Sequence, residues 1–203
     1  MRVKIGMMQS NVKIAITGGI CSGKSTIAKI IGEQGYKVFS CDEIYQELLG
    51  DINFINLLNK EFTGVKNSDG TLNRNKLSDI VFNDSDNLQK LNSITHPKIM
   101  QRAMELMSGE GIFFCEVPLL FEGGFESQFD NVVVVLRDES ERVGELMHRS
   151  KIDENQAILR LKSQFNYNNY DFTMYYVIHN NGNLTELRSA SLDLLEKIVK
   201  DYN

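Results

Sequence analysis

An apolar segment that runs directly into a glycine-rich loop constrains this chain more than any other feature. Residues 14–26 read IAITGGICSGKST and match the pattern G-x-x-x-x-G-K-S/T at every required position. Residues 12–17 have the composition of a buried strand, and apolar residues at helical spacing follow from Ile27. Glycines let backbone N–H groups turn towards a phosphate, and a helix start attracts the same anion. The sequence therefore predicts a phosphate-binding loop between a strand and a helix.

The pattern assigns separate tasks to the residues of this loop. Lys24 is expected to reach the β- and γ-phosphates, and Ser25 to be a ligand of Mg²⁺. The other loop residues expected around the nucleotide are Gly18, Gly19, Cys21, Ser22, Gly23 and Thr26. A glycine-rich turn that binds nothing is the alternative, and the flanking strand and helix disfavour it.

Length, charge and cysteine content restrict the class of protein. The 203 residues suffice for one well-packed domain with insertions. A net charge of −5 gives no support for a nucleic-acid partner, and no segment approaches the roughly 18 apolar residues that cross a membrane. Cys21, Cys41 and Cys115 are too scattered for a disulfide framework or a zinc site, so we expect a reducing, cytoplasmic setting. Residues 1–11 are interpreted as a short N-terminal extension without a signal peptide.

Further apolar segments predict the rest of a parallel sheet. The helix after the loop should end before Gly35, because glycine suits the left-handed position beyond a helix end. The other predicted strands cover residues 36–39, 112–117, 132–136 and 176–178. The predicted fold class is therefore α/β, with a parallel five-stranded sheet flanked by helices, as in P-loop nucleoside-triphosphate hydrolases and kinases.

The alternation of strands and helices is interrupted between the second and third strands. Residues 43–110 read as mostly helical, with a turn at Asn67–Gly70. Two of the expected helices cover residues 88–94 and 97–107, and the second begins at Pro97, where a missing N–H costs nothing. We interpret residues 43–110 as a helical insertion over the rim of the sheet.

The remaining residues divide into a nucleotide-binding core and a lid. The core is expected to comprise residues 12–42, 111–140 and 174–203. Residues 141–173 form the expected lid. Asp138, just before it, is expected to cap the first of two short helices, and Asp153 to start the second. The end of this region, residues 165–176, is rich in Asn and Tyr and is interpreted as a soft loop that either stacks on a purine or only connects.

Asp42 and the basic residues of the lid are the candidates for chemistry outside the loop. Asp42 follows the second strand, at the edge of an α/β sheet where ligands bind, so it can orient a hydroxyl and help to hold Mg²⁺. An N-cap for a helix over residues 43–49 explains Asp42 equally well. The basic residues of the lid are Arg142, Arg149, Lys151, Arg160 and Lys162. They suit a lid that brings arginine to a phosphoryl group, although solvated surface charge is the commoner explanation for any one of them.

Taken together, longer strings resemble one family, dephospho-CoA kinase, from Lys13 to about Leu187. The loop is similar to the family's TGGIGSGKST, and residues 38–42 match its V-x-x-x-D. THP at residues 95–97 and EVPLLFE at residues 116–122 are more selective, because generic nucleotide kinases lack them. Further matches lie at residues 70–74, 91–99, 146–149, 160–164 and 177–182.

This resemblance implies ATP-dependent phosphorylation of the ribose 3′-hydroxyl of dephospho-CoA, the last step of coenzyme A synthesis, with Mg²⁺. Asp42 matches the family's catalytic carboxylate, and Arg149 and Arg160 match lid positions that contact phosphates. Positions that match the acceptor site are Arg74, His96, Leu119 and Leu120. For His96, packing or capping of the helix at Pro97 is an equally good explanation. The expected partner is a small molecule rather than nucleic acid or membrane, and the expected state is a monomer or small homo-oligomer.

The sequence departs from the family pattern at three sites, and two rival functions are considered. Ser40-Cys41-Asp42 replaces the usual Asp-Ala-Asp, Cys21 stands where glycine is common, and Met174-Tyr175 replaces Ala-Asp. One rival is a kinase of another small acceptor, such as a nucleoside monophosphate or shikimate. The other is a GTP-dependent switch, which needs an N-K-x-D string after a strand, whereas residues 59–62 read NKEF.

Overall fold

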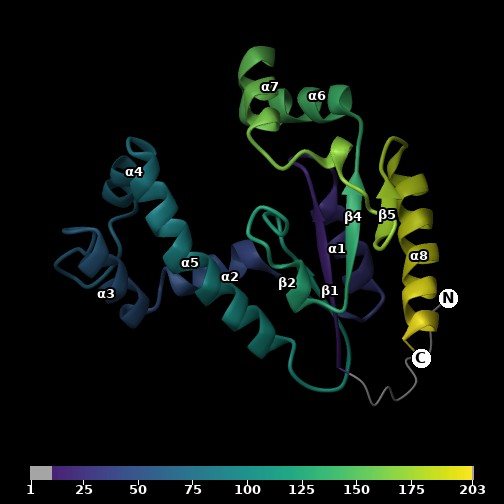
Figure 1. Ribbon diagram of the computed structural model, residues 1–203, viewed down its shortest axis with the longest axis horizontal. Coiled ribbons are helices and arrows are strands. Elements are labelled where there is room, and N and C mark those ends of the chain that lie inside the picture. Colours follow the sequence, from purple (N-terminus) through teal and green to yellow (C-terminus); the bar gives the residue numbers. More distant parts are fainter. Residues whose placement is uncertain (1–10, 203) are drawn as a thin grey trace. The chain divides into compact units, whose positions relative to one another are not determined.

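The computed structural model describes residues 11–202 (Figure 1). Its strands are β1 (Asn11–Gly18), β2 (Lys37–Ser40), β3 (Gly111–Glu116), β4 (Asn131–Leu136) and β5 (Tyr176–His179). Its α-helices are α1 (Lys24–Glu33), α2 (Cys41–Leu48), α3 (Ile52–Glu61), α4 (Arg74–Phe82), α5 (Ser85–Leu106), α6 (Glu139–Ser150), α7 (Glu154–Lys162) and α8 (Leu184–Asp201). Short 3₁₀ helices lie at η1 (Glu126–Gln128) and η2 (Tyr167–Asn169).

The strands form one five-stranded sheet in the order β2-β3-β1-β4-β5. β1 pairs in parallel with both β3 and β4, and β4 pairs in parallel with β5. The predicted α/β fold with its parallel sheet is confirmed. Because β1 is the central strand, the loop that follows it lies at the middle of the carboxyl edge, where open α/β sheets bind ligands.

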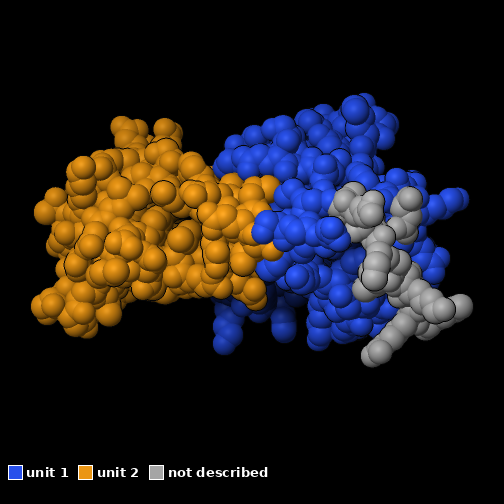
Figure 2. Space-filling view, turned by 90° about the horizontal axis from the view of Figure 1, so that it is seen from below, with its two compact units in different colours: residues 1–39, 107–203 blue, residues 40–106 orange. Residues whose placement is uncertain are grey.

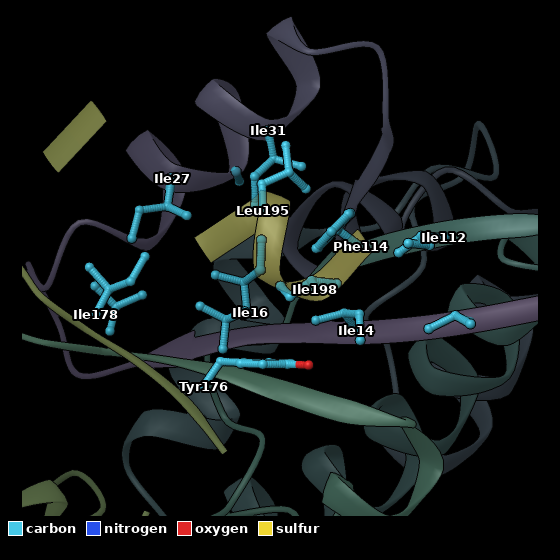
Figure 3. Close-up of a cluster of buried hydrophobic side chains, with 14 of the residues drawn as sticks. Ile14, Ile16, Ile27, Ile31, Ile112, Phe114, Tyr176, Ile178, Leu195 and Ile198 are labelled. Atoms are coloured by element: carbon cyan, nitrogen blue, oxygen red, sulfur yellow. The ribbon is translucent and has the colours of Figure 1, made fainter. Parts of the chain in front are cut away.

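Helices α1 and α8 cover one face of this sheet, and their apolar side chains form its main core (Figure 3). Ile14 and Ile16 of β1 are wholly buried there, together with Ile27 and Ile198 from the two helices. The alternate β1 residue Ala15 is also wholly buried. Burial on both faces explains why the central strands read as continuous apolar runs.

The chain divides into two compact units, residues 1–39 with 107–203 and residues 40–106 (Figure 2). The second unit consists of α2 to α5 around its own apolar core, in which Leu58 and Val65 are completely buried. The predicted turn at Asn67–Gly70 is present: the Gly70 amide donates to the Asn67 carbonyl at 3.0 Å. The helical character predicted for this region is confirmed.

One helix boundary in the second unit was predicted wrongly. Pro97 lies inside the single helix α5 and does not begin a new one. Proline removes one helical hydrogen bond, but a helix can continue through it when packing on both sides holds the segment. Leu91 and Ile99, on either side of Pro97, are buried, and the Thr95 hydroxyl donates to the Leu91 carbonyl at 2.9 Å.

The two lid helices α6 and α7 share a small core of their own. Val143 and Leu146 of α6 pack against Ala157 and Leu161 of α7. Both predicted starts are confirmed: Asp138 is the N-cap of α6, and Asp153 caps α7 in a capping box with Gln156. The Asp153 side chain therefore caps its helix, whereas Asp138 forms no side-chain cap and its Oδ1 accepts from Asn181 Nδ2 at 2.8 Å.

Residues 165–176, predicted as a soft loop, pack through their aromatic side chains. Phe121 lies with ring centroids 5.0 to 6.1 Å from five aromatic rings of this segment, those of Phe165, Tyr167, Tyr170, Phe172 and Tyr175. Tyr167 and Phe172 are buried. The aromatic side chains thus pack on one another and on Phe121, which fixes the path of the chain from α7 to β5.

Of the N-terminal extension predicted for residues 1–11, residues 1–10 lie outside the described residues. Asn11 does not belong to an extension, because it is the first residue of β1. Within residues 11–202, none of the helices combines the length and apolar character needed to cross a membrane.

Candidate active site

Two glycines set the shape of the loop between β1 and α1. Gly18 and Gly23 have φ values of +149° and +102°. A Cβ atom on Gly18 would lie 2.3 Å from the Val135 carbonyl oxygen, and one on Gly23 would lie 2.3 Å from Asn180 Nδ2. Gly23 is the N-cap of α1 and forms no side-chain cap, so the first N–H groups of the helix remain available to an anion.

Cys21 adopts a left-handed conformation that glycine would adopt more easily. Its φ is +58°, so the loop geometry expected to favour glycine at this position is present with a side chain in place. Cys21 packs against the core that α6 and α7 share. The thiol therefore joins the loop to the lid helices at the cost of backbone strain, which is of the order of 1–2 kcal/mol for such a residue.

Lys24 and Ser25, the two residues with predicted phosphate and magnesium roles, both lie at the start of α1. The Lys24 Nζ donates to the carbonyl oxygens of Gly18 and Gly19 at 2.8 and 3.0 Å, so its ammonium lies across the loop. The Ser25 Oγ donates to Glu116 Oε1 at 2.8 Å. Glu116 ends β3 beside the loop and was not among the predicted site residues.

Three further side chains that the sequence reasoning missed hold the backbone of the loop. Gln164 Oε1 accepts from the Ile20 amide at 2.7 Å, and Asn180 Nδ2 donates to the Ser22 carbonyl at 2.8 Å. Arg137 Nη1 donates to the Cys21 carbonyl at 3.2 Å. Glu116, Gln164 and Asn180 all lie within the family-like strings, which were the available signal. A sequence match to the family does not show which loop atoms these side chains contact.

Arg142, in the second turn of α6, lies directly against the loop. A Cβ atom on Gly19 would be 2.7, 2.8 and 3.0 Å from its Nη1, Cζ and Nη2 atoms. Desolvation by burial lowers the pKa of this guanidinium, and the nearby Glu139 carboxylate opposes that shift. By contrast, the predicted lid cations Arg149 and Arg160 are exposed in the last turns of α6 and α7.

In the second unit, Asp42 is the second residue of α2, whose N-cap is Ser40. The alternative explanation of Asp42 as the helix N-cap is therefore wrong. Asp42 and Glu43 both belong to the first turn, where a carboxylate interacts favourably with the positive end of the helix. The side chain of Asp42 is exposed.

The four predicted acceptor residues have different surroundings. In the second unit, Arg74 begins α4, where its Nη1 donates to Gln46 Oε1 at 2.7 Å. His96 lies within α5, and its burial lowers the pKa of the imidazole. This position also excludes a cap on a helix that starts at Pro97. In the first unit, Leu119 is 40% exposed whereas Leu120 is fully buried.

Comparison with known proteins decides the family. The model of the dephospho-CoA kinase family matches residues 12–186. The chain belongs to this family.

Similar proteins from two bacteria agree with this assignment. A dephospho-CoA kinase of Fusobacterium nucleatum is 34% identical over 177 residues, which cover 86% of this chain and 92% of that protein. A dephospho-CoA kinase of Streptococcus agalactiae is also 34% identical, over 91% of this chain and 98% of its own. The matches thus cover nearly the full length of both relatives.

Solved structures support both the family and the fold. A protein from Thermus thermophilus has a TM-score of 0.76 at 30% identity and covers 92% of this chain and 97% of its own. The dephospho-CoA kinase from Campylobacter jejuni has a TM-score of 0.69 at 26% identity over 93% of this chain and 98% of its own. A shikimate kinase from Bacteroides thetaiotaomicron, with a TM-score of 0.56 at 12% identity, shares the fold alone.

Proposed function

We propose that this protein transfers the γ-phosphoryl group of ATP to the ribose 3′-hydroxyl of dephospho-CoA, which yields coenzyme A and ADP. The match of the family model to residues 12–186 carries the proposal. The shape of the loop supports ATP as the phosphoryl donor. In-line transfer of this kind depends on positioning and charge neutralisation and needs no covalent intermediate.

The donor nucleotide is held by the loop and by the start of α1. The proposed contacts are made by Gly18, Gly19, Cys21, Ser22, Gly23, Lys24, Ser25 and Thr26. Lys24 already extends its ammonium across the loop, which supports a role at the β- and γ-phosphates. Arg149 is proposed to stabilise the transferring phosphoryl group, and Arg160 to contact the nucleotide, when the lid (residues 141–173) covers the site.

Magnesium is proposed to bind at Ser25 and Asp42. The donor chemistry is suitable, because the Ser25 hydroxyl and the Glu116 carboxylate that accepts from it are hard oxygen groups. Within the described residues, no cluster of three or more His, Cys, Asp or Glu side chains is placed to hold a metal ion. This is consistent with an ion bound largely by phosphates and water. When bound, Mg²⁺ neutralises charge on the phosphates.

The acceptor is proposed to bind through residues 43–110 and the loop after β3. Asp42 orients and deprotonates the 3′-hydroxyl, and its position after Ser40 supports this role because capping does not occupy it. Arg74 and His96 contribute polar contacts from the second unit. Leu119 contributes exposed apolar surface, and the buried Leu120 fixes the loop that carries it.

We also propose the setting in which the protein works. It acts in the cytoplasm on small molecules, without a nucleic-acid or membrane partner, as a monomer or small homo-oligomer. The net charge of −5 supports the absence of a nucleic-acid partner.

Release of ADP from Mg·ATP, measured with and without dephospho-CoA, tests the proposed function. We expect release to require the acceptor, and mass spectrometry of the product to show one added phosphate on dephospho-CoA. Shikimate and nucleoside monophosphates serve as competing acceptors in the same assay. ADP release driven equally well by one of them, or strong GTP binding with no acceptor-dependent turnover, would overturn the proposal.

A further inference from the structure

The guanidinium of Arg142 lies where a side chain on Gly19 would be. Three atoms of the guanidinium lie 2.7 to 3.0 Å from the position that a Gly19 Cβ would take. Such nearly equal distances place the planar group face-on against the glycine. A side chain on Gly19 would therefore displace the Arg142 guanidinium, whereas the φ of Gly19 is not in the positive region and does not itself call for glycine.

The Arg142 guanidinium lies beside the loop and forms no ion pair with a described residue. Its Nε is buried and has no hydrogen-bond partner within residues 11–202. None of the ion pairs among the described residues includes Arg142. Burial also lowers the pKa of the guanidinium, with Glu139, Cys21 and Tyr167 exerting smaller opposing effects. A partly desolvated cation of this kind is costly unless an anion binds beside it.

A second cation contacts the same glycine. The Lys24 ammonium donates to the Gly19 carbonyl at 3.0 Å, and the lysine of a phosphate loop reaches the β- and γ-phosphates. Lys24 and Arg142 thus meet at Gly19 from two elements, α1 and α6. Two cations that approach the same loop residue both favour an anion bound beside it. The terminal phosphate of a nucleoside triphosphate would be such an anion.

We propose that Arg142 is a further catalytic residue, which contacts the terminal phosphate of the donor nucleotide and stabilises the phosphoryl group during transfer. The assignment rests on the proposed kinase function. Arg149 and Arg160 lie exposed on the lid, whereas Arg142 already touches the phosphate loop. A hollow of about 250 Å³ lies beside Arg142 and is also lined by Gln164 and Tyr167, so the side chain is not packed in on that side.

Comparison of triphosphate and diphosphate binding tests this proposal. Calorimetry with Mg²⁺ measures the affinity of the wild type and of Arg142→Gln for ADP and for a non-hydrolysable ATP analogue. Loss of a charge-assisted hydrogen bond to the terminal phosphate should weaken the analogue about 10-fold or more. ADP affinity should change less than about twofold, because ADP lacks that phosphate. Equal loss for both ligands, or no loss for either, would overturn the proposal.

Gly19→Ala provides a second, independent variant. It leaves Arg142 in the sequence but places a methyl group where the guanidinium lies. We expect the same selective loss of analogue binding, and little additional loss when both substitutions are combined. Full additivity in the double variant would show that Arg142 does not act at Gly19.

Arg188→Ala is the matched control, because it removes an exposed arginine that pairs with Glu33, at the end of α1 opposite the loop. Thermal melting of each variant verifies folding. Acceptor-dependent ADP release by the wild type tests the proposed function separately. If the wild type shows no such release, the kinase proposal fails, whereas the contrast between the two nucleotides still decides the contact made by Arg142.

Discussion

At the scale of single residues, the position of Asp42 separates two roles that the sequence left open. A carboxylate at a helix start either caps the helix or remains available for chemistry. Ser40 occupies the N-cap position of α2, although its side chain forms no cap hydrogen bond, and Asp42 lies two residues further on. Asp42 therefore stabilises α2 only through its charge near the positive end of the helix, and Glu43 in the same turn does so too.

Asp42→Asn should therefore remove catalysis and leave nucleotide binding nearly intact. An amide cannot accept the proton of the 3′-hydroxyl, and loss of a general base lowers turnover by about 10²- to 10⁴-fold. Steady-state ADP release and calorimetric ADP affinity measure the two effects. Glu43→Gln is the matched control, because it removes a neighbouring carboxylate from the same helical turn. Similar losses of turnover in both variants would show that helix electrostatics, and not Asp42 chemistry, is responsible.

Cys21 yields a prediction about stability. Its left-handed backbone tolerates small side chains, but a β-branched residue is strongly disfavoured in that conformation. We expect Cys21→Val to lower the free energy of unfolding by about 1–2 kcal/mol relative to Cys21→Ala. Urea denaturation of the two variants measures the difference. Equal stability would mean that the loop relaxes to another conformation without cost.

At the scale of elements, the segment after α7 links the lid to the phosphate loop. Gln164 accepts from the Ile20 amide, and the hydroxyls of Tyr167 and Thr17 share a hydrogen bond at 3.3 Å. The Phe165 amide donates to Glu122 Oε1 at 3.0 Å. One short segment thus contacts both the loop after β1 and the loop after β3. Its aromatic packing against Phe121 makes these contacts mutually dependent.

Gln164→Ala should loosen the loop before any ligand binds. The Ile20 amide loses its partner, which costs about 1–3 kcal/mol when the donor is left unsatisfied. We expect a lower urea midpoint and several-fold weaker ADP binding, since the loop must then be ordered by the ligand. Asn168→Ala, an exposed position in the same segment, is the control. Unchanged ADP affinity with reduced stability would confine Gln164 to a purely structural role.

At the scale of the whole molecule, the features predicted correctly are those that depend on residues close together in the sequence. The loop motif, the apolar strands and the caps at Asp138 and Asp153 depend on neighbours in sequence, and all were predicted. The continuity of α5 through Pro97 depends on packing in the second unit, which no local pattern contains. The contact of Arg142 with Gly19 joins residues far apart in the chain, so composition could show only that Arg142 is a basic residue of the lid.

The pH dependence of unfolding gives a prediction for the molecule as a whole. Burial lowers the pKa of His96 below its ordinary value of 6.5, so the unfolded chain binds a proton there at a higher pH than the folded chain does. The free energy of unfolding should therefore fall as the pH decreases below about 6.5, and this term should be constant above it. Glu61 and Asp69, whose pKa values are lowered from 4.5 and 3.8 by hydrogen bonds to Lys90 and Thr71, affect stability only at lower pH.

His96→Gln should remove this decline between about pH 5 and 6.5, because glutamine does not titrate. Urea denaturation at half-unit intervals of pH measures the slope for each variant. If His96→Gln keeps the wild-type slope, the folded protein accommodates a charged His96, and the imidazole is then able to serve as a cationic contact for the acceptor near neutral pH.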